Sequence, residues 1–286
     1  MTNFHTLLQS RTPLLLPGAH DALSARMIEA AGFSAYGVGG AALSAVQLGL
    51  PDVGLQSFGE YREAVGRILE ASTLPVMIDG ENGFGDVKAV TRTVRRFERM
   101  GVGGLAFEDL VFPPPLGRPP AVIARAEMVA KLEAALAARN DEALFIVGRT
   151  DAAHAVSEDE AILRARLYQA TGVDAVLATG LANLAAYQRL RDAVTVPIVA
   201  VVVPGSPWFA PTLADLTRVG IEAALYPAAL LSRLLPAISD GLNAIRDADG
   251  APPSGFDLRS IGEVLKTADW LEVDRRFAVD KGKSNP

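Results

Sequence analysis

The sequence contains no cysteine, and this excludes several kinds of chemistry. Disulfide bonds, thiolate metal sites and a cysteine nucleophile are all ruled out. A chain without disulfides is compatible with the cytoplasm, where we expect this protein. The sequence also lacks any run of about 18 apolar residues. Its first apolar run, LLLP at 14–17, follows no basic segment, so we expect neither a signal peptide nor a membrane span.

Positive charge and histidine are also scarce. Lys and Arg total 27 against 33 Asp and Glu, which gives a formal net charge of −6, and the two signs are interspersed. Binding to phosphate backbones needs a basic face, so this balance argues against a nucleic acid partner. The three histidines do not cluster, and no Ser-His-Asp arrangement can be argued from their spacing.

Short apolar runs alternate with amphipathic helical patterns along the chain. The runs are unbroken, which is typical of parallel strands that are covered on both faces. Eight runs are predicted as strands: 14–17, 34–39, 74–79, 104–108, 144–149, 175–179, 197–203 and 223–227. Helical patterns between them include 86–100, 127–140 and 158–171. Several end just before a glycine, which suits a left-handed C-cap.

This alternation predicts the fold class. Eight strands alternating with helices indicate an α/β protein with a (β/α)8 TIM-type barrel, here over residues 1–250. The rival is an open doubly wound sheet, but no GxGxxG follows the first strand. Residues 251–286 are predicted as a C-terminal helical extension. Its apolar residues Leu265, Trp270 and Leu271 need a surface, either the underside of the barrel or a neighbouring subunit.

Carboxylates follow the predicted strands where a barrel places its active site. Asp79 and Glu81 end the third strand, Glu108 ends the fourth, and Asp52 lies in the loop after the second. Crowded carboxylates repel one another unless a cation is present, and oxygen ligands suit Mg²⁺, with Mn²⁺ as a substitute. We predict Asp79, Glu81 and Glu108 as metal ligands, and Asp52 and Glu108 as catalytic residues. The alternative is that these acids are helix caps and ion-pair partners.

Two features predict where an anionic substrate binds. Arg149 ends an apolar strand, where an arginine is costly to bury without a carboxylate partner. A substrate carboxylate would provide one, and so would an internal pair with Glu108 or Asp151. Glycines after the second strand let the backbone approach an anion. The predicted substrate-binding residues are Gly39, Gly40, Ala41, Asp79 and Arg149, and Arg149 is also predicted to act in catalysis.

The segment 110–125 is long for a loop between a strand and a helix, and it holds five prolines. Long loops in compact domains are often lids or binding loops. One interpretation is a gate over the metal, with Gly117 as its pivot and Arg118 as a catalytic charge that closes on the substrate. The other is a rigid surface excursion.

These motifs resemble those of the isocitrate lyase / phosphoenolpyruvate mutase superfamily over residues 13–235. The matching pieces read PGAHDALSARMIEAAGF, GLPDVGL, PVMIDGENGFG, FEDLVFP, IVGRTDA and GVDAVL. The resemblance implies Mg²⁺ held directly by Asp79 and through waters by Glu81, Glu108 and Asp52, with Arg149 on a substrate carboxylate. It implies an oxo-acid substrate and an enolate stabilised by Lewis-acid action. It also implies a homotetramer, a dimer of dimers, in which a C-terminal helix crosses to a neighbour.

Departures from the superfamily pattern narrow the reaction. Glu81 stands where members usually carry an aspartate, and its longer arm can alter the water shell of the metal. Superfamily lyases carry a K-K/R-C-G-H run in the gating loop, so cysteine-dependent cleavage of isocitrate or 2-methylisocitrate is not expected here. LATG and VAVVVPG replace a Glu and an Asn on strands six and seven, which predicts a more apolar pocket. The loop VFPPPLGR resembles more closely the cysteine-free branch that decarboxylates oxaloacetate.

The sequence therefore predicts a Mg²⁺-dependent carbon–carbon lyase that acts on a small 2-oxo or 2-hydroxy dicarboxylic acid through an enolate. The reaction would be an oxaloacetate decarboxylation or another C–C cleavage. One alternative is a phosphonate mutase or phosphonopyruvate hydrolase. Another is a non-catalytic barrel that binds a metabolite. The expected partners are the small-molecule substrate and further copies of this chain, with no nucleic acid and no membrane.

Overall fold

The computed structural model describes residues 3–10, 12–114, 119–203, 205, 209–247 and 258–277, with the backbone alone at 258–260. Within these residues, eight strands alternate with helices: β1 (Leu14–Ala19), β2 (Tyr36–Val38), β3 (Val76–Asp79), β4 (Gly104–Glu108), β5 (Phe145–Thr150), β6 (Ala175–Ala178), β7 (Val199–Val201) and β8 (Ala223–Tyr226).

All of these strands pair in parallel and form one sheet that curls into a nearly closed barrel. Their order is β6-β5-β4-β3-β2-β1-β8-β7, so the first strand lies beside the last. A parallel bridge between Val176 and Ile198 brings β6 to β7 and completes the ring. The predicted (β/α)8 TIM-type barrel is therefore confirmed, and the open doubly wound sheet is not formed.

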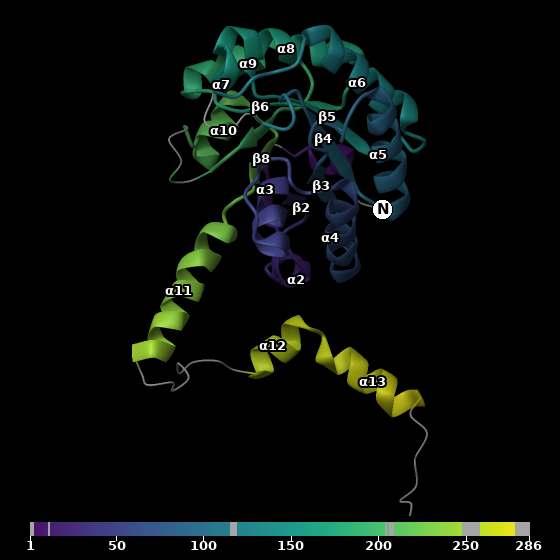
Figure 1. Ribbon diagram of the computed structural model, residues 1–286, viewed down its shortest axis with the longest axis vertical. Coiled ribbons are helices and arrows are strands. Elements are labelled where there is room, and N and C mark those ends of the chain that lie inside the picture. The colour runs from purple at the N-terminus through teal and green to yellow at the C-terminus, as the bar shows by residue number, and fades with distance from the viewer. Residues whose placement is uncertain are drawn as a thin grey trace, which may run out of the picture. The chain divides into compact units, whose positions relative to one another are not determined.

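Helices and single turns fill the connections. Their bounds are α1 (Phe4–Leu7), α2 (Ala22–Ala30), α3 (Gly40–Leu43), a π-helix η1 (Ser44–Leu48), α4 (Phe58–Ala71), α5 (Val87–Met100), α6 (Arg125–Ala138), α7 (Ala152–Ala155), α8 (Glu158–Thr171), α9 (Leu184–Ala193), α10 (Leu213–Val219), α11 (Leu231–Asp247), α12 (Leu258–Val264) and α13 (Thr267–Phe277). Within the barrel unit, helices such as α4, α5, α6, α8 and α9 lie outside the strands (Figure 1). As predicted, α5, α8 and α10 end at left-handed glycines, Gly101, Gly172 and Gly220. None of the described helices has both the length and the apolar character of a membrane span.

The core has two layers, and the inner one determines where a pocket can open. The side chain of Phe4 is fully buried inside the barrel, with its ring centroid 5.8 Å from that of Phe145. It also approaches Gly103 and Gly104 at the start of β4. Burying a phenylalanine contributes about 1.5–3 kcal/mol. The N-terminal end of the barrel is therefore filled, and the C-terminal end remains for a site.

Two compact units make up the chain, Met1–Arg233 and Leu234–Pro286. The boundary between these units falls within α11. Neither α11 nor α13 buries any residue. Trp270 and Leu271, which we expected to need a surface, are 69% and 65% exposed.

Candidate active site

A cavity of about 320 Å³ lies at the C-terminal ends of the strands. Its polar lining comes from Asp52, Asp79, Arg149, Asp151 and Thr179. The rest is mostly apolar, with Leu177, Val201 and Leu225 supplied by β6, β7 and β8. This agrees with the apolar pocket expected from LATG and VAVVVPG. The predicted substrate-binding residues Gly39, Gly40 and Ala41 also line the cavity, at the start of α3.

The loop that follows Asp79, the last residue of β3, carries the predicted metal ligand Glu81 in a strained backbone. Glu81 and Phe84 have φ angles of 52° and 60°, in the left-handed region that residues with a side chain rarely adopt. Hydrogen bonds hold this conformation. The Glu81 N–H donates to Asp79 Oδ1 at 2.9 Å, and the Tyr61 hydroxyl donates to the Asp79 carbonyl oxygen at 2.5 Å. Such strain is concentrated at functional sites in proteins.

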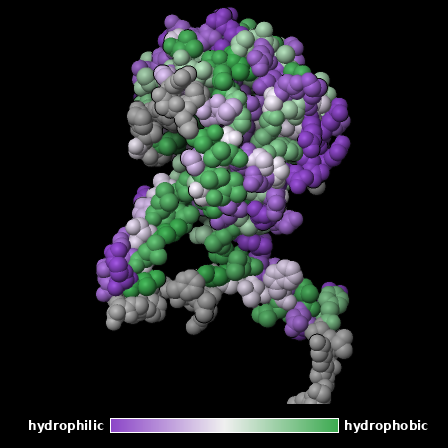
Figure 2. All heavy atoms as spheres, viewed as in Figure 1, coloured by the Kyte–Doolittle hydropathy of each residue, from purple (hydrophilic) through white to green (hydrophobic). Residues whose placement is uncertain are grey.

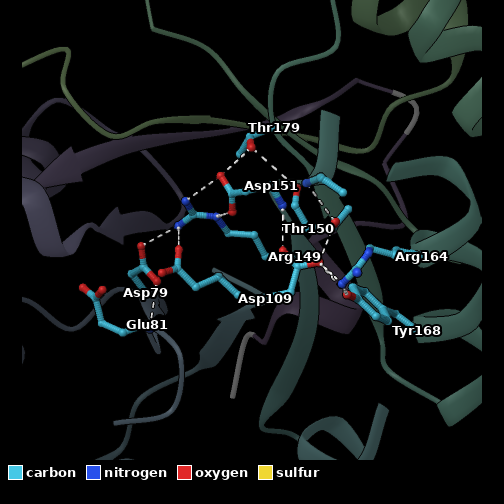
Figure 3. Close-up of polar contacts among 11 residues, drawn as sticks. Asp79, Glu81, Asp109, Arg149, Thr150, Asp151, Arg164, Tyr168 and Thr179 are labelled. Atoms are coloured by element: carbon cyan, nitrogen blue, oxygen red, sulfur yellow. Dashed lines mark hydrogen bonds and ion pairs between the residues drawn. The ribbon is translucent and has the colours of Figure 1, made fainter. Parts of the chain in front are cut away.

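Arg149 lies in the middle of the carboxylates (Figure 3). Its Nη1 is 2.9 Å from Asp79 Oδ2 and 2.9 Å from Glu108 Oε2. Its Nε and Nη2 donate to the two oxygens of Asp151 at 2.9 and 3.1 Å. The internal pairing that the sequence left open is thus present, and it includes Asp79 as a third partner. Arg149 can turn to a substrate carboxylate only if another cation takes over Asp79 and Glu108.

The carboxylates at this site outnumber the positive charges beside them. Burial raises the pKa of Glu108 to about 8, against the opposing effect of Arg149. Burial raises the pKa of Asp79 as well, again against Arg149. Burial, followed by the negative charges of Asp79 and Glu108, raises the pKa of Glu81 well above its usual range. Partial burial and the charge of Asp79 raise the pKa of Asp52 at the rim. One guanidinium therefore does not neutralise this group.

The donor set fits a hard divalent cation. Among the residues that the structure describes, no three His, Asp or Glu side chains converge on one point as a ready-made metal site. Mg²⁺ does not require that, because it usually keeps several waters and takes one or two carboxylates directly. Asp79 and Glu108 both contact Arg149 Nη1. These two carboxylates therefore already have one positive charge between them. A cation at this point would offset both the burial and the mutual repulsion that raise the pKa values of these acids.

A buried network behind the pocket positions Arg149 through Asp151. Thr179 Oγ1 donates to Asp151 Oδ1 at 2.6 Å, and the Asp151 N–H donates to Asp109 Oδ1 at 2.9 Å. Because Asp151 binds two nitrogens of the guanidinium, these contacts set the plane of the Arg149 side chain. Thr179 is not among the residues predicted from the sequence, where its only signal is a hydroxyl at the end of an otherwise apolar strand.

Asp109 is the centre of this network and has no exposed surface. It accepts hydrogen bonds from Thr150 Oγ1 at 2.7 Å and from the Tyr168 hydroxyl at 2.6 Å, and it pairs with Arg164 at 3.1 Å. These partners come from β5 and α8. The sequence signal was available, because Arg164 and Tyr168 occur at i and i+4 within the face of α8 that is buried.

The long loop after β4 is closed at its base by a bridge between Leu110 and Val122. Gly54, two residues after Asp52, packs against Phe112 of this loop, so the rim carrying Asp52 and the loop are in contact. Gly117 and Arg118, the predicted pivot and closing charge, lie outside the described residues. Their role in a gate therefore remains a prediction.

Comparison with known proteins agrees with this architecture. The sequence profile described as phosphoenolpyruvate phosphomutase matches residues 4–246. An oxaloacetate decarboxylase of Bradyrhizobium sp. (strain BTAi1) is 37% identical over 268 residues, which cover 92% of this chain and 91% of that protein. A solved oxaloacetate acetylhydrolase in complex with the inhibitor 3,3-difluorooxalacetate superimposes with a TM-score of 0.88 at 26% identity, covering 98% of this chain and 96% of that one.

A second similar structure is a phosphonopyruvate hydrolase in complex with oxalate and Mg²⁺. Its TM-score is 0.85 at 24% identity, covering 96% of this chain and 97% of that one. At this identity the likeness shows the fold alone.

Proposed function

This chain belongs to the phosphoenolpyruvate phosphomutase family, and from that premise we propose that it is a Mg²⁺-dependent carbon–carbon lyase that decarboxylates oxaloacetate to pyruvate. The relative that shares 37% of its residues is named an oxaloacetate decarboxylase. The acetylhydrolase at 26% identity was solved with a fluorinated oxaloacetate bound. Both support a small 2-oxo dicarboxylic acid as the substrate here.

One observation carries the proposal: five carboxylates surround a single arginine at the pocket. They are Asp52, Asp79, Glu81, Glu108 and Asp151. A dianionic substrate cannot approach such a group unless a cation is present, because like charges in a partly buried site repel strongly. A divalent metal at Asp79 would reverse the local charge and make the pocket attractive to an oxo acid.

In this proposal Asp79 holds Mg²⁺ directly, while Glu81 and Glu108 hold its waters, and Mn²⁺ can substitute. The bound metal supplies Lewis-acid stabilisation for negative charge that develops at the 2-oxo oxygen. Arg149, freed from Asp79 and Glu108, holds the carboxylate beside the oxo group. No side chain caps α3, so the backbone N–H groups of Gly40 and Ala41 are available to the same carboxylate.

The apolar wall assists the departure of carbon dioxide. Leu177, Val201 and Leu225 offer no hydrogen bond to the second carboxylate of oxaloacetate. A carboxylate loses hydration there, whereas carbon dioxide is uncharged and loses little. The wall therefore favours the uncharged product and leaves an enolate to be protonated to pyruvate. Arg118 stays our proposed catalytic charge, which closes on the substrate.

The test is pyruvate formation from oxaloacetate by the full-length protein, with the rate caused by Mg²⁺ alone subtracted. We expect turnover that a chelator abolishes. We also expect Asp79→Asn to lower the rate by about 100-fold or more, because this change would weaken binding of the metal that stabilises the developing charge. Asp192→Asn, which removes an exposed carboxylate on α9, is the matched control and should leave the rate unchanged. Pyruvate forming no faster than with Mg²⁺ alone would reject the decarboxylase.

The same assay separates the alternatives. The match to a phosphomutase profile favours phosphonopyruvate as the second substrate to try. Release of phosphate from it would assign phosphonate hydrolysis, and formation of phosphoenolpyruvate would assign the mutase. Mg²⁺ and oxalate binding without turnover of either substrate would assign a non-catalytic metabolite-binding barrel.

We further propose a cytoplasmic homotetramer, a dimer of dimers, in which residues 251–286 cross to a neighbouring subunit. The absence of cysteine supports the compartment. An apolar face on α11 supports the assembly, and hydrophobic residues are visible along this helix in Figure 2. Its members Leu235, Ile238, Leu242 and Ile245 are between 46% and 63% exposed.

A further inference from the structure

A groove of about 440 Å³ on the outside of the barrel is lined almost entirely by basic side chains of α4 and α5. The lining residues are Phe58, Arg62, Lys88, Thr91, Arg92, Arg95, Arg96 and Arg99. None of them lines the candidate active site. Figure 2 shows hydrophilic residues gathered on the edge where Figure 1 places α5. The whole-chain charge of −6 conceals this concentration of positive charge.

Most of the charge in the groove has no internal counterion. Lys88 pairs with Asp86, and the guanidinium of Arg92 lies over the Phe58 ring at 5.5 Å from its centroid. No ion pair or hydrogen bond to another described residue is formed by the remaining four, Arg62, Arg95, Arg96 and Arg99. By contrast, three arginines on other helices pair with carboxylates, namely Arg164, Arg189 and Arg191.

The spacing makes these charges unfavourable for the helix itself. Lys88, Arg92 and Arg96 are four residues apart along α5, and so are Arg95 and Arg99. Like charges at this spacing face one another and destabilise a helix. Lys88 also stands in the first turn, where the helix dipole disfavours a cation. An external anion would relieve all of these repulsions at once.

The dimensions of the groove select the kind of anion. Lys88 and Arg99 are eleven residues apart on α5, which corresponds to about 16 Å along the helix. This exceeds a single phosphate and suits a chain of phosphates. Guanidinium groups bind phosphate oxygens with two parallel hydrogen bonds, so a row of arginines can grip successive phosphates.

The surroundings argue against a larger polyanion. The two helices that line the groove also carry acids: Glu63 and Glu70 are exposed on α4, and Asp86 is the N-cap of α5. A nucleic acid needs a basic surface that continues over several elements, and these acids interrupt it. We propose that the groove binds a polyphosphate-bearing small anion, either inorganic polyphosphate or a nucleoside triphosphate.

The proposal is tested by calorimetric titration of the full-length protein with inorganic triphosphate and with ATP. The buffer holds chelator and constant ionic strength, so that neither metal nor general screening contributes. We expect saturable binding that Arg95→Gln/Arg99→Gln weakens at least about tenfold, because charge-assisted bonds are lost. Equal affinities for triphosphate and ATP would mean that the groove recognises the phosphate chain alone. Tighter binding of ATP would mean that the nucleoside also contributes to binding. Both outcomes support the proposal.

Arg189→Gln/Arg218→Gln removes the same charge from exposed positions on α9 and α10 and is the matched control. Triphosphate should raise the thermal unfolding temperature of the wild type and of this control, but not that of the groove variant. Binding weakened equally in both variants would overturn the proposal, and so would no binding. A single-stranded DNA oligonucleotide that binds the groove more tightly than triphosphate would overturn it too. So would a change of oligomeric mass in the groove variant alone, because the groove would then contact another copy of the chain.

Discussion

Gly40 determines where a predicted metal ligand can lie, because it has no side chain. A Cβ built at Gly40 would overlap Oε1 of Glu81 and lie 2.9 Å from its carboxyl carbon. That carboxylate is the far end of a flexible arm, so it would swing aside before the barrel backbone moved. The glycine thus reserves space for the longer acid that this chain carries after β3.

The first prediction follows from this contact. Gly40→Ala should leave the thermal unfolding temperature within a few degrees of the wild type, yet weaken Mg²⁺ binding about tenfold by displacing Glu81. Calorimetric titration with Mg²⁺ measures the second effect. Gly59→Ala, where the nearest atom to a new Cβ is 3.8 Å away, is the control for an added methyl group. Unchanged Mg²⁺ affinity in Gly40→Ala would mean that Glu81 does not serve the metal.

At the scale of single residues, the sequence indicated where the site residues lie better than which residues they contact. Acids at the ends of β3 and β4 could be predicted because strand ends converge at one mouth of a barrel. Among the partners of Arg149, the sequence offered Glu108 and Asp151 as alternatives to a substrate carboxylate, but not Asp79, whose contact depends on side-chain directions on neighbouring strands. Asp109 shows the limit most clearly. It follows Glu108 directly, and the residues that mark it as a buried structural acid, Arg164 and Tyr168, are 55 and 59 positions away in the sequence.

At the scale of the elements, the side chain of Glu160 links α6 and α8 by hydrogen bonds. Glu160 of α8 accepts hydrogen bonds from Arg164 Nε at 2.7 Å and from Arg125 Nε of α6 at 2.9 Å. The hydrogen bond from Arg125, partly opposed by burial and supported by Arg164, lowers the pKa of Glu160 to about 2. The ionised form is thus favoured in the folded protein over the unfolded chain.

This gives a pH-dependent prediction. The contribution of Glu160 to stability is complete above its unfolded pKa of 4.5 and is lost as the pH falls through about 2. Since Arg125 is half exposed and screened by solvent, we expect roughly 1 to 2 kcal/mol at neutral pH. Urea unfolding of Glu160→Gln should show this loss at pH 7. The gap to the wild type should close steadily between pH 4.5 and 2, and a gap independent of pH would contradict the assignment.

The apolar pattern of the sequence predicted which segments are strands, but it did not predict where each strand ends. All eight predicted strands occur, but β2 and β7 are shorter than the runs 34–39 and 197–203. Apolar residues continue past the hydrogen-bonded part of each strand, because they still line the core or pocket. The single turns α3 and α7 and the π-helix η1 were not predicted, since four or five residues are too few to show a helical period.

At the scale of the whole molecule, the exposed apolar face of α11 is relevant to how copies of the chain assemble. Leu235, Ile238, Leu242 and Ile245 recur at the spacing of one helix face. An exposed apolar stripe of this kind normally packs against another surface.

We therefore predict that light scattering of the wild type gives a tetrameric mass, and that Leu235→Glu/Leu242→Glu lowers it. Charges placed on an apolar contact cannot be buried without a partner, so the contact should open. Val156→Glu changes an equally exposed apolar residue, 64% exposed, in the other unit and should keep the wild-type mass. A monomeric wild type would contradict the proposed assembly.

The pairing of β1 with β8 has a consequence for synthesis. Leu14–Ala19 emerges from the ribosome early, but the strand that covers its open edge, Ala223–Tyr226, is made about 200 residues later. At typical elongation rates this delay lasts roughly 10 to 40 s. During that time the nascent chain presents an unpaired apolar strand to other proteins in the cell. Because residues 234–286 follow β8, the ring can close while the chain is still being translated.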